Sequence, residues 1–332
     1  MDLIQLAHGS GGRMMHQLIK EFFVPAFDMR ELGDSAVLKN TFSDRIAVTT
    51  DSYVVSPLFF PGGDIGRLSV CGTVNDLAVS GATPVYMTAG FIIEEGFPFD
   101  HLRRVLASMR SAAREAGVRI VAGDTKVVDR GKADGLFINT AGFGVVDEGL
   151  ELSSSKVKPG DKVLLSGSMG NHGVAVMAER NGISFEPPLL SDVRPLNTLV
   201  RRMLERTDKI HMMRDPTRGG VATTLNEIAS ESGRCIVVQE SAITITPGVR
   251  GACELLGLDP LYIANEGILI AVAEPSVAEE LADEMRTTSE GVGAAIIGEV
   301  VEGPMGTVLL KTSVGGIRIV DMLSGDQLPR IC

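Results

Sequence analysis

Carboxylates in short polar turns are the residues of this sequence whose type and spacing suggest shared chemistry. Asp51 is expected directly after a strand over 46–50, and Asp124 directly after a strand over 118–122. Carboxylates at strand ends lie where α/β folds place their ligands, and hard oxygen donors without His or Cys suit Mg²⁺. Taken singly, each Asp near glycine is explained at least as well by turn formation and helix capping. The full set is Asp34, Asp51, Asp76, Asp124, Asp215 and Glu266.

Glycine-rich turns before two predicted helices could hold phosphate oxygens. Gly11 and Gly12 precede an amphipathic segment, and a second glycine pair follows Arg218 and precedes a helix over 221–232. Exposed backbone N–H groups at such helix starts can bind anions. Lys126, two residues after Asp124, could neutralise phosphate charge. A flexible turn for each glycine pair and a solvated loop position for the lysine are the simpler alternatives.

The last residue, Cys332, is a candidate of a different kind. A terminal thiol is mobile and exposed, whereas free cysteines are usually buried. The neighbouring α-carboxylate should raise its pKa, so Cys332 is a poor self-activated nucleophile. It is better suited to carry a group that other active sites modify. Cys71, Cys235 and Cys253 lie in apolar surroundings and are expected in the core.

Alternating helical and strand-like segments predict an α/β or α+β class. The clearest helix covers 100–116, with Asp100 as N-cap and Gly117 as its end, and a second runs from Pro275 to Gly291. Further strands are predicted over 136–146, 162–165, 235–238 and 267–272.

A polar, turn-prone stretch over 148–161 predicts a domain boundary. The expected division is an N-terminal domain over 1–150, a C-terminal domain over 151–320, and a mobile tail over 321–332. The tail is polar, contains Gly325 and Pro329, and is expected outside the packed body. At ~3.3–3.6 Å per residue it could reach both an inward and an outward position.

Composition and missing motifs exclude several classes. The 332 residues carry a formal net charge of −11, which argues against nucleic acid as a partner. The longest uncharged run, 77–93, contains turn residues and is too short for a membrane span, no signal peptide is visible, and a cytoplasmic protein is expected. P-loop, Rossmann and zinc-protease motifs are absent from the sequence.

The combination of motifs resembles the HypE family of hydrogenase maturation factors, the carbamoyl dehydratases. The resemblance spans essentially the whole chain, and the terminal Pro-Arg-Ile-Cys is its most specific part. One departure is Asn171, where the family pattern favours an acidic residue, which puts a metal-ligand role of that position in doubt. The matching stretches are 8–12, 50–54, 57–63, Asn75-Asp76, 123–128, 214–220, 264–267 and 329–332.

The resemblance implies a fold like that of aminoimidazole ribonucleotide synthetase, with an N-terminal mixed-sheet α/β domain and a C-terminal α+β domain. Two protomers would pair through their N-terminal sheets as a homodimer, so the resemblance implies that residues 1–150 are the ATP-binding and dimerisation domain. The partners would be a HypF-type carbamoyltransferase, which loads Cys332, and HypC/HypD-type iron-scaffold proteins, which receive the cyanide.

The resemblance also implies a reaction, the ATP- and Mg²⁺-dependent dehydration of an S-carboxamide on Cys332 to a thiocyanate. Glu266 would be the base, and Lys126 would stabilise the transferring phosphoryl group. Nucleotide and metal contacts would come from Asp51, Asp76, Asp124 and Asp215, with Asp34 as a further metal ligand and Asn75, Gly11, Gly12, Lys126 and Arg218 as further nucleotide contacts.

Two rival functions remain. A selenophosphate synthetase would place a reactive Cys or selenocysteine near the N-terminus, but here the first cysteine is Cys71 and the N-terminal loop holds His8. A non-catalytic scaffold whose tail docks on a partner would not need the carboxylate and lysine set.

Overall fold

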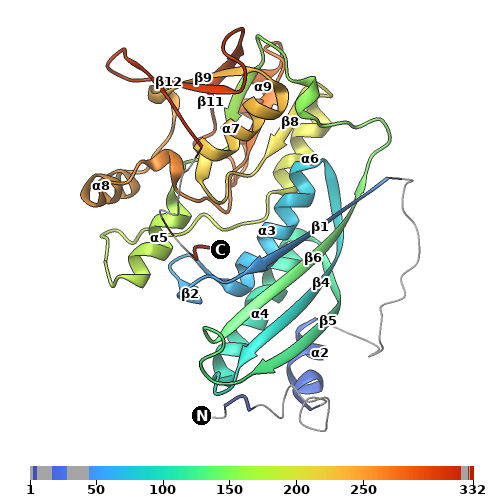
Figure 1. Ribbon diagram of the computed structural model, residues 1–332. Coiled ribbons are helices and arrows are strands. Elements are labelled where there is room, and N and C mark those ends of the chain that lie inside the picture. The colour runs from blue at the N-terminus through green and yellow to red at the C-terminus, as the bar shows by residue number, and fades with distance from the viewer. Residues whose placement is uncertain (1–2, 6–16, 28–44, 323–327, 329) are drawn as a thin grey trace.

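The computed structural model describes residues 3–5, 17–27, 45–322, 328 and 330–332. These residues form two β-sheets with helices packed against them, and the C-terminus returns to the middle of the molecule near α5 and β2 (Figure 1). A two-domain α/β and α+β architecture was expected from the sequence and is confirmed.

Four strands form the first sheet, in the order β1-β6-β4-β5. Only the β4–β5 pair is parallel, and the other two pairs are antiparallel. Side chains of a strand alternate between the two faces, and β6 alternates between buried and more exposed residues along its whole length. The strands are β1 Ile46–Tyr53, β4 Ala82–Glu94, β5 Arg119–Val128 and β6 Leu136–Val146, with a small hairpin of β2 Phe59–Phe60 and β3 Gly63–Asp64.

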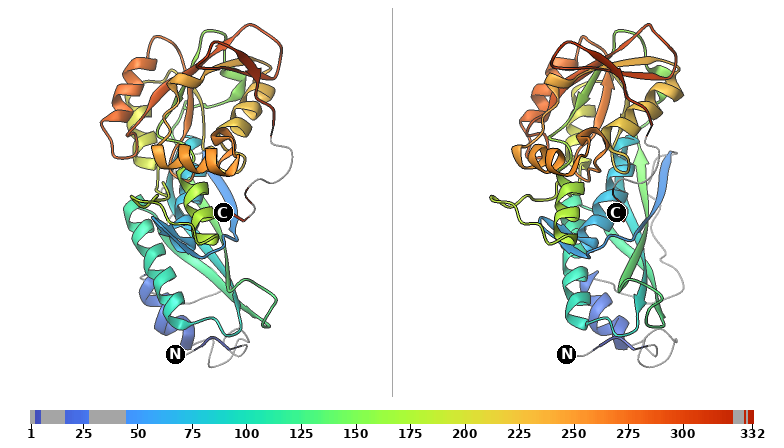
Figure 2. Two further views of the ribbon diagram at one scale, coloured as in Figure 1. Left: turned by 90° about the vertical axis from the view of Figure 1, so that its left-hand side faces the viewer. Right: turned by 60° about the vertical axis from the view of Figure 1, so that its left-hand side comes forward.

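Two helices, α3 (Ile65–Val79) and α4 (Phe99–Ala116), cover one face of this sheet (Figure 2). The buried side of α4 is the one that its three- and four-residue spacing predicts, and Gly117 ends it with φ 72°. The predicted N-cap is wrong, because Pro98 occupies that position and Asp100 lies in the first turn. The described N-terminal helical segment contains η2 (Ile19–Phe23) and α2 (Val24–Ala26).

Seven strands form the second sheet, in the order β13-β12-β9-β11-β7-β10-β8. The strands are β7 Lys162–Leu165, β8 Ile210–Arg214, β9 Cys235–Gln239, β10 Ile270–Ala273, β11 Ala295–Val301, β12 Thr307–Lys311 and β13 Ile317–Ile319. Its helices are α5 Asn171–Arg180, α6 Asn197–Arg206, α7 Gly220–Ser232, α8 Pro247–Leu256 and α9 Ala278–Arg286, with short turns η3 Ser154–Lys156, η4 Glu240–Ala242 and η5 Pro260–Tyr262.

Two predicted elements are shorter than expected. The helix predicted over 275–291 is α9, because residues before Ala278 form a turn that closes on Glu274. The strand predicted over 267–272 begins only at Ile270, because the amide of Gly267 donates to Asp192 and not to a neighbouring strand. The short apolar strand β7 and the alternating strand β6 match their predicted bounds.

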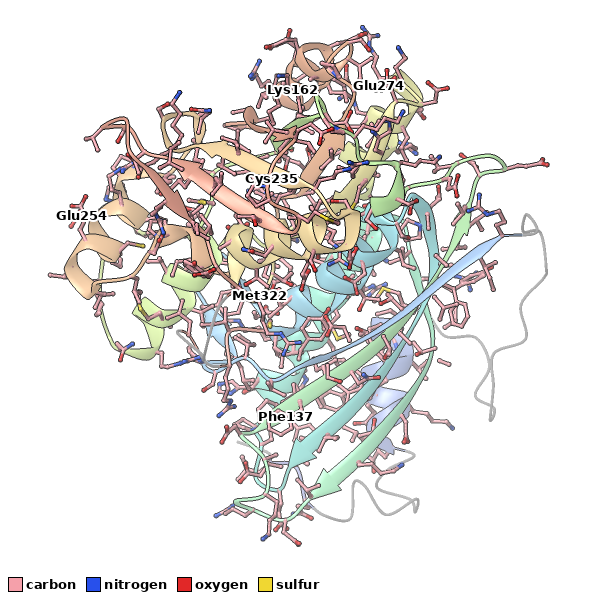
Figure 3. All side chains as sticks on the ribbon, turned by 45° about the horizontal axis from the view of Figure 1, so that its top comes forward. Phe137, Lys162, Cys235, Glu254, Glu274 and Met322 are labelled. Carbon is pink, nitrogen blue, oxygen red and sulfur yellow. The ribbon has the colours of Figure 1, made fainter. Side chains whose placement is uncertain are left out.

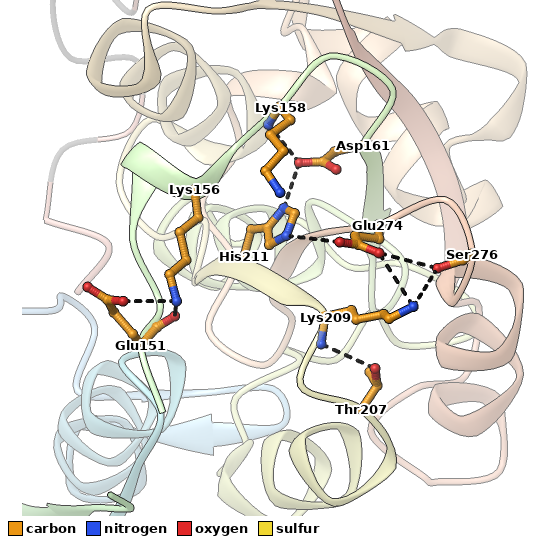
Figure 4. A network of polar contacts seen from close by, with 9 residues as sticks. All are labelled: Glu151, Lys156, Lys158, Asp161, Thr207, Lys209, His211, Glu274 and Ser276. Carbon is orange, nitrogen blue, oxygen red and sulfur yellow. Dashed lines mark hydrogen bonds and ion pairs between the residues drawn. The ribbon is translucent and has the colours of Figure 1, made fainter. Parts of the chain in front are cut away.

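A buried polar network ties together the ends of strands in the second sheet (Figure 4). His211 Nδ1 lies 2.7 Å from a carboxylate oxygen of Asp161, which also accepts the amide of Lys158. Glu274 lies on the other side of the imidazole and pairs with Lys209. Because Asp161 precedes β7, His211 lies in β8 and Glu274 follows β10, the network fixes three strand ends and has a structural role.

In the described ranges, no helix is long and apolar enough to span a membrane. All strands of the first sheet precede the 148–161 stretch and all strands of the second sheet follow it, since β6 ends at Val146 and β7 begins at Lys162. We propose this stretch as the domain boundary.

Candidate active site

Asp51 and Asp76 face each other between the first sheet and the helix that covers it. Asp51 lies within β1, not after it as predicted, since the antiparallel ladder with β6 continues to Tyr53. Residues of β1 with odd numbers point toward α3, which places Thr49 and Asp51 on the inner face. The Thr49 hydroxyl donates to a carboxylate oxygen of Asp76 at 2.9 Å. Asp76 is on α3 and is partly buried.

Asp215 and Glu266 add two further acids to this group, from the C-terminal half of the chain. Burial, together with the nearby charges of Asp76 and Asp51, raises the pKa of Asp215 to about 7. The pKa of Glu266 lies well above its usual range, because the side chain is buried and because Asp215 and Asp192 repel its charge. Four predicted residues therefore share one electrostatic environment, although they lie far apart in the sequence.

Two asparagines hold the loops that carry these acids. Asn265 donates to the carbonyl oxygens of Pro216 and Ile263 and accepts the amide of Gly170 at 2.6 Å. Asn75 donates to the carbonyl oxygen of Arg194 at 3.1 Å, more weakly to that of Glu266, and accepts the amide of Leu196. Both side chains are almost fully buried. Their hydrogen bonds fix the Glu266 loop to α3, to the Asp215 loop and to the start of α5. Direct contact of Asn75 with a nucleotide stays a prediction.

Asp192 is a buried acid that the sequence analysis missed. One carboxylate oxygen accepts the amides of Glu266 and Gly267, at 3.2 and 3.0 Å, whereas the other is buried without a hydrogen-bond partner. Burial raises its pKa to about 6. A side chain at Gly267 would collide with the carbonyl oxygen of Asp192, so glycine is required directly after Glu266. No turn or strand signal in the sequence marks Asp192, because its partner lies more than seventy residues away.

Asp124 and Lys126 lie apart from this group within one chain. They were expected after a strand but lie inside β5, on the outer face of the sheet, opposite the side that α3 covers. Their side chains form an ion pair of 2.7 Å and are each about 60% exposed. Lys126 donates to both oxygens of Asp124, which lowers the pKa of that carboxyl. Because β5 and β1 are the two edge strands of the four-stranded sheet, three strand-to-strand distances separate Asp124 and Lys126 from β1.

The remaining predicted site residues differ in how well the structure places them. Arg218 is exposed directly before the start of α7, where Gly219 has φ 75°. The Asn171 side chain is engaged with Thr246 and Ser168, in agreement with the doubt about a metal-ligand role. Gly11, Gly12 and Asp34 lie outside the described residues.

The C-terminus contradicts one expectation, since residues 330–332 are packed into the body of the protein. The Ile331 side chain is 3% exposed and belongs to the same apolar core as Phe60 and Val176. The main-chain oxygen of the terminal residue Cys332 accepts the amide of Val54 at 3.2 Å. An apolar side chain and main-chain partners near the end of β1 outweigh the polar character of the segment. The Cys332 thiol is half-buried, whereas the other three cysteines are buried as expected.

Comparisons with known proteins agree with this architecture. Residues 32–146 match the model of the AIR synthase related protein N-terminal domain, and residues 158–311 match that of the C-terminal domain. The chain is 52% identical over 332 residues to carbamoyl dehydratase HypE of Cupriavidus necator, covering 99% of this chain and 95% of the relative. The chain belongs to the HypE family.

Two solved HypE structures extend the comparison. One is a hydrogenase maturation protein HypE in complex with ATP, with a TM-score of 0.96, 47% identity, and coverage of 99% of this chain and 100% of that one. The other is HypE in a HypE–HypF complex, with a TM-score of 0.81, 47% identity, and coverage of 92% of this chain and 99% of that one.

Proposed function

We propose that this HypE-family chain is an ATP-dependent carbamoyl dehydratase that converts an S-carboxamide on Cys332 to a thiocyanate, the source of cyanide for hydrogenase iron. The supporting observation is that the terminal cysteine docks just after β1. Its main-chain oxygen accepts the amide of Val54, three residues after Asp51, and its side chain packs against the same apolar core as Ala264, two residues before Glu266. The family membership and the ATP complex of a related HypE support the same reaction.

The chemistry has one main obstacle, which is that an amide oxygen leaves poorly as hydroxide. ATP supplies the phosphoryl group that lets this oxygen leave as phosphate, so that the carboxamide and ATP give the thiocyanate, ADP and phosphate. Two protons must leave the nitrogen as the triple bond forms. The chain's own residues must hold the S-carboxamide in place, accept a proton and balance the phosphate charge.

Glu266 is the proposed base. A general base works best when its pKa lies near the working pH, and burial among other carboxylates raises the pKa of Glu266 in that direction. The Asn75 and Asp192 hydrogen bonds fix its main chain, so the side chain has a defined position. Lys126 is the proposed partner of the transferring phosphoryl group. Because Lys126 lies on the outer face of the first sheet, away from Glu266 within one chain, this role requires the second chain of the proposed homodimer to supply it.

The acidic group fits a cation, but the protein side chains alone would not complete the coordination of the ion. Among the described residues, no three His, Cys, Asp or Glu side chains converge as a metal-binding group. Burial is the main cause that raises the pKa values of Asp76 and Asp215. The charge of Asp51 also raises the pKa of Asp76, and the charges of Asp76 and Asp51 raise that of Asp215, so a bound cation would relieve this environment. We propose that Asp51, Asp76 and Asp215 bind Mg²⁺ together with nucleotide phosphate oxygens, the combination that this ion prefers.

Replacing Asp76 with asparagine should weaken the Mg²⁺-dependent part of ATP binding by roughly tenfold, about 1.4 kcal/mol, because a hard anionic ligand is lost. Calorimetric titration with and without Mg²⁺ measures this difference. The matched control is Asp283→Asn on the exposed side of α9, which should change nothing. Equal Mg²⁺ dependence in the wild type and Asp76→Asn would exclude Asp76 as a ligand.

The same acids predict a pH dependence of stability. Asp215 has a pKa of about 7 in the folded chain and about 3.9 when unfolded, so its stabilising contribution is complete below about 4 and is lost as the pH rises through 7. We expect the melting temperature without ligand to fall between about pH 5 and pH 8. Mg²⁺ with ATP should reverse part of this fall, and Asp215→Asn should flatten it. A melting temperature that rises over this range in the wild type would contradict the assignment.

The open face of the first sheet supports a homodimer. Figures 1 and 2 show α3 and α4 on one face only. Apolar side chains of the first sheet lie exposed on the other face. Phe137 and Phe143 of β6 belong to this outer face, and Figure 3 labels Phe137 there. Large exposed apolar patches mark association sites. We propose that two chains pair through this face, which also carries Asp124 and Lys126. The strongly exposed members are Ile46, Val48, Ile92 and Phe143.

Val48→Asp should therefore convert the dimer to a monomer, because it places a charge in the centre of an apolar interface. Val48 is 58% exposed, so the change should not disturb folding of the single chain. Light scattering after size-exclusion chromatography measures the mass. Val314→Asp, at a position 93% exposed between β12 and β13, is the matched control and should leave the mass unchanged. A monomeric wild type would contradict the proposal.

The partners follow from the proposed reaction. The solved HypE–HypF complex of a relative supports a HypF-type carbamoyltransferase as the source of the carbamoyl group. HypC/HypD-type proteins are the proposed acceptors of cyanide. Loading by such a transferase requires the docked residues to leave their position, so we propose that Arg330, Ile331 and Cys332 undock during the reaction cycle. The rest of the predicted mobile tail over 321–332 includes residues 323–327 and 329, which lie outside the described residues. Incubation with the transferase, its carbamoyl donor and ATP, followed by mass spectrometry of the C-terminal peptide, tests the function. The carbamoylated peptide should lose the mass of one water.

Cys71 gives a specific reason to set aside the selenophosphate synthetase alternative. Such an enzyme would use its first cysteine as a reactive thiol. Here Cys71 is fully buried in α3, and burial raises the pKa of its thiol far above the ordinary value, so no reactive thiolate forms.

A further inference from the structure

Strand β13 forms one edge of the second sheet, and its outer side is open. It pairs with β12 only and stands at the end of the strand order. The amide of Val320 donates to the carbonyl oxygen of Val308, and Arg318 has the same orientation because hydrogen-bonded positions alternate along an antiparallel ladder. The N–H and C=O groups of Ile317 and Ile319 therefore face outward, and within the described chain they have no hydrogen-bond partner.

The side chains of Ile317 and Ile319 lie on a face of the sheet that is apolar at this edge. They are 67% and 60% exposed, and Ile319 lies opposite Leu309, which in turn lies beside Val237. Residues that pair across strands share a face, so these four side chains form one surface over β9, β12 and β13, called here the edge surface. On the same side of the sheet, the apolar cluster of α6 and α9 includes residues of β7, β8 and β10 but, among the described residues, none of these three strands.

Strand β13 also leads directly into the segment that ends at Cys332. Val320, the next residue, is 2% exposed and belongs to the apolar core of the second sheet, and the Tyr262 hydroxyl donates to the carbonyl oxygen of Asp321 at 2.9 Å. The start of the tail is thus fixed to the body. At ~3.3–3.6 Å per extended residue, residues 321–332 span at most ~40 Å, so a partner bound at β13 has the terminal thiol within reach.

The open edge defines the kind of segment that fits it. Outward N–H and C=O groups on an exposed strand are satisfied by a further strand, the mode in which many extended segments bind. Two residues of an added antiparallel strand would lie opposite Ile317 and Ile319, on the apolar face, and the residue between them would lie opposite Arg318. Arg318 pairs with Asp259 at 2.6 Å but stays 43% exposed, so an acidic residue is favoured opposite it. The edge therefore fits an apolar–acidic–apolar segment.

A second copy of this chain fits the edge less well than a different protein. If two β13 strands paired about a two-fold axis through their outward groups, Ile317 of one chain would lie opposite Ile319 of the other, and the two Arg318 side chains would lie directly opposite each other. Like charges in that position destabilise a pair of strands. The edge surface is also separate from the proposed homodimer face, since β9 and β12 lie at the top of Figure 1, away from the first sheet.

We propose that β13 and the edge surface bind an apolar–acidic–apolar segment of the HypF-type carbamoyltransferase as an added strand. The choice of this partner rests on the proposed function, in which the transferase must receive the thiol of Cys332. Binding at β13 would hold the transferase where the tail leaves the body and not at the end of the tail. The last residues of the chain would then be free to pass between the two active sites while the two proteins stay bound.

Hydrogen exchange of single amides in the full-length chain, with and without the HypF-type transferase, tests the added strand. The amides of Ile317 and Ile319 should exchange quickly in the free chain and roughly tenfold or more slowly in the complex, because hydrogen bonding protects an amide from exchange. The amide of Val320 is the internal control, since it is already bonded to Val308 and should change little.

Two variants of Ile319 test the surface by affinity. Ile319→Lys places a charge on the edge surface and keeps every main-chain group, whereas Ile319→Pro removes an outward N–H but no donor of the ladder with β12. Calorimetric titration with the transferase should show each variant binding roughly tenfold or more weakly, the effect of losing one buried apolar side chain. Leu255→Lys on α8, at a position 76% exposed, is the matched control and should bind like the wild type. Melting temperatures verify that each variant folds.

The outcomes separate the docking surface from the proposed function. The docking proposal is wrong if the transferase does not bind the wild type, or if it binds the wild type and both Ile319 variants equally and leaves the Ile317 and Ile319 amides unprotected. Protection of these amides by a HypC/HypD-type acceptor complex and not by the transferase would overturn the choice of partner. Protection already present in the free chain would show that the chain itself, or a second copy of it, covers the edge, and would also overturn the proposal. If the transferase protects the edge but the wild type forms no thiocyanate, the proposed function fails and the docking surface stands.

Discussion

Replacing Cys332 with serine is expected to abolish thiocyanate formation completely, because no sulfur remains to carry the carbamoyl group. The fold should be unaffected. The Cys332 thiol is half-buried, and the hydrogen bond from Val54 uses the main-chain oxygen of residue 332, which serine retains. We expect a change in unfolding free energy within about 0.5 kcal/mol, as for a substitution away from the core. ATP affinity should also stay at the wild-type value.

The control is Cys253→Ser in α8, which changes a thiol in the same way at a buried position. It should lower stability, since it places a hydroxyl in an apolar cluster, but it should leave product formation at Cys332 intact. Mass spectrometry of the C-terminal peptide and the melting temperature separate the two variants. A Cys332→Ser chain that still delivers cyanide to iron would show that another residue is the carrier.

Local patterns in the sequence account for much of the fold. The alternation of β6 and the apolar run of β7 define both strands to the residue, because a two-residue period and a bounded apolar run leave little choice. The buried face of α4 follows from its spacing in the same way. Asp51 and Asp124 were placed beyond their strands because polar residues resemble strand ends. In fact both lie on strands at the edges of the first sheet, where one side of the backbone has no partner strand in the described chain.

Long-range contacts explain what the sequence did not indicate. The acid cluster could be proposed from turn-like acids, but the grouping of Asp51, Asp76, Asp215 and Glu266 away from Asp124 depends on which face of the sheet each strand residue takes. His172 was not distinguished, because its partner at Ile331 lies 159 residues away. The docking of the tail was missed for the same reason, because the hydrogen-bond partners of residues 330–332 come from the chain just after β1 and from α5. No local period encodes such pairs.

Glu266→Gln is the second change for which a large effect is expected. Dehydration of loaded Cys332 should slow by about 10²–10⁴-fold, the range for loss of a general base. Glutamine keeps the size of the side chain, and the hydrogen bonds that fix this loop use the main chain of Glu266, so the geometry should persist. Stability should not fall. The buried charge is repelled by Asp215 and Asp192, and its removal should raise the melting temperature.

The pH dependence separates a base from a merely structural residue. Because a base must be deprotonated, the wild-type rate should rise with pH through the raised pKa of Glu266, and the glutamine variant should lose this dependence. Stability should behave in the opposite way. A raised folded-state pKa means that the contribution of Glu266 is present at low pH and lost as the pH rises, so the gain in melting temperature from Glu266→Gln should be larger at pH 8 than at pH 5. Glu254→Gln on the exposed side of α8 is the matched control and should change neither profile. A glutamine variant with an unchanged rate but altered stability would remove Glu266 from the reaction and leave it a purely structural part of the acidic group.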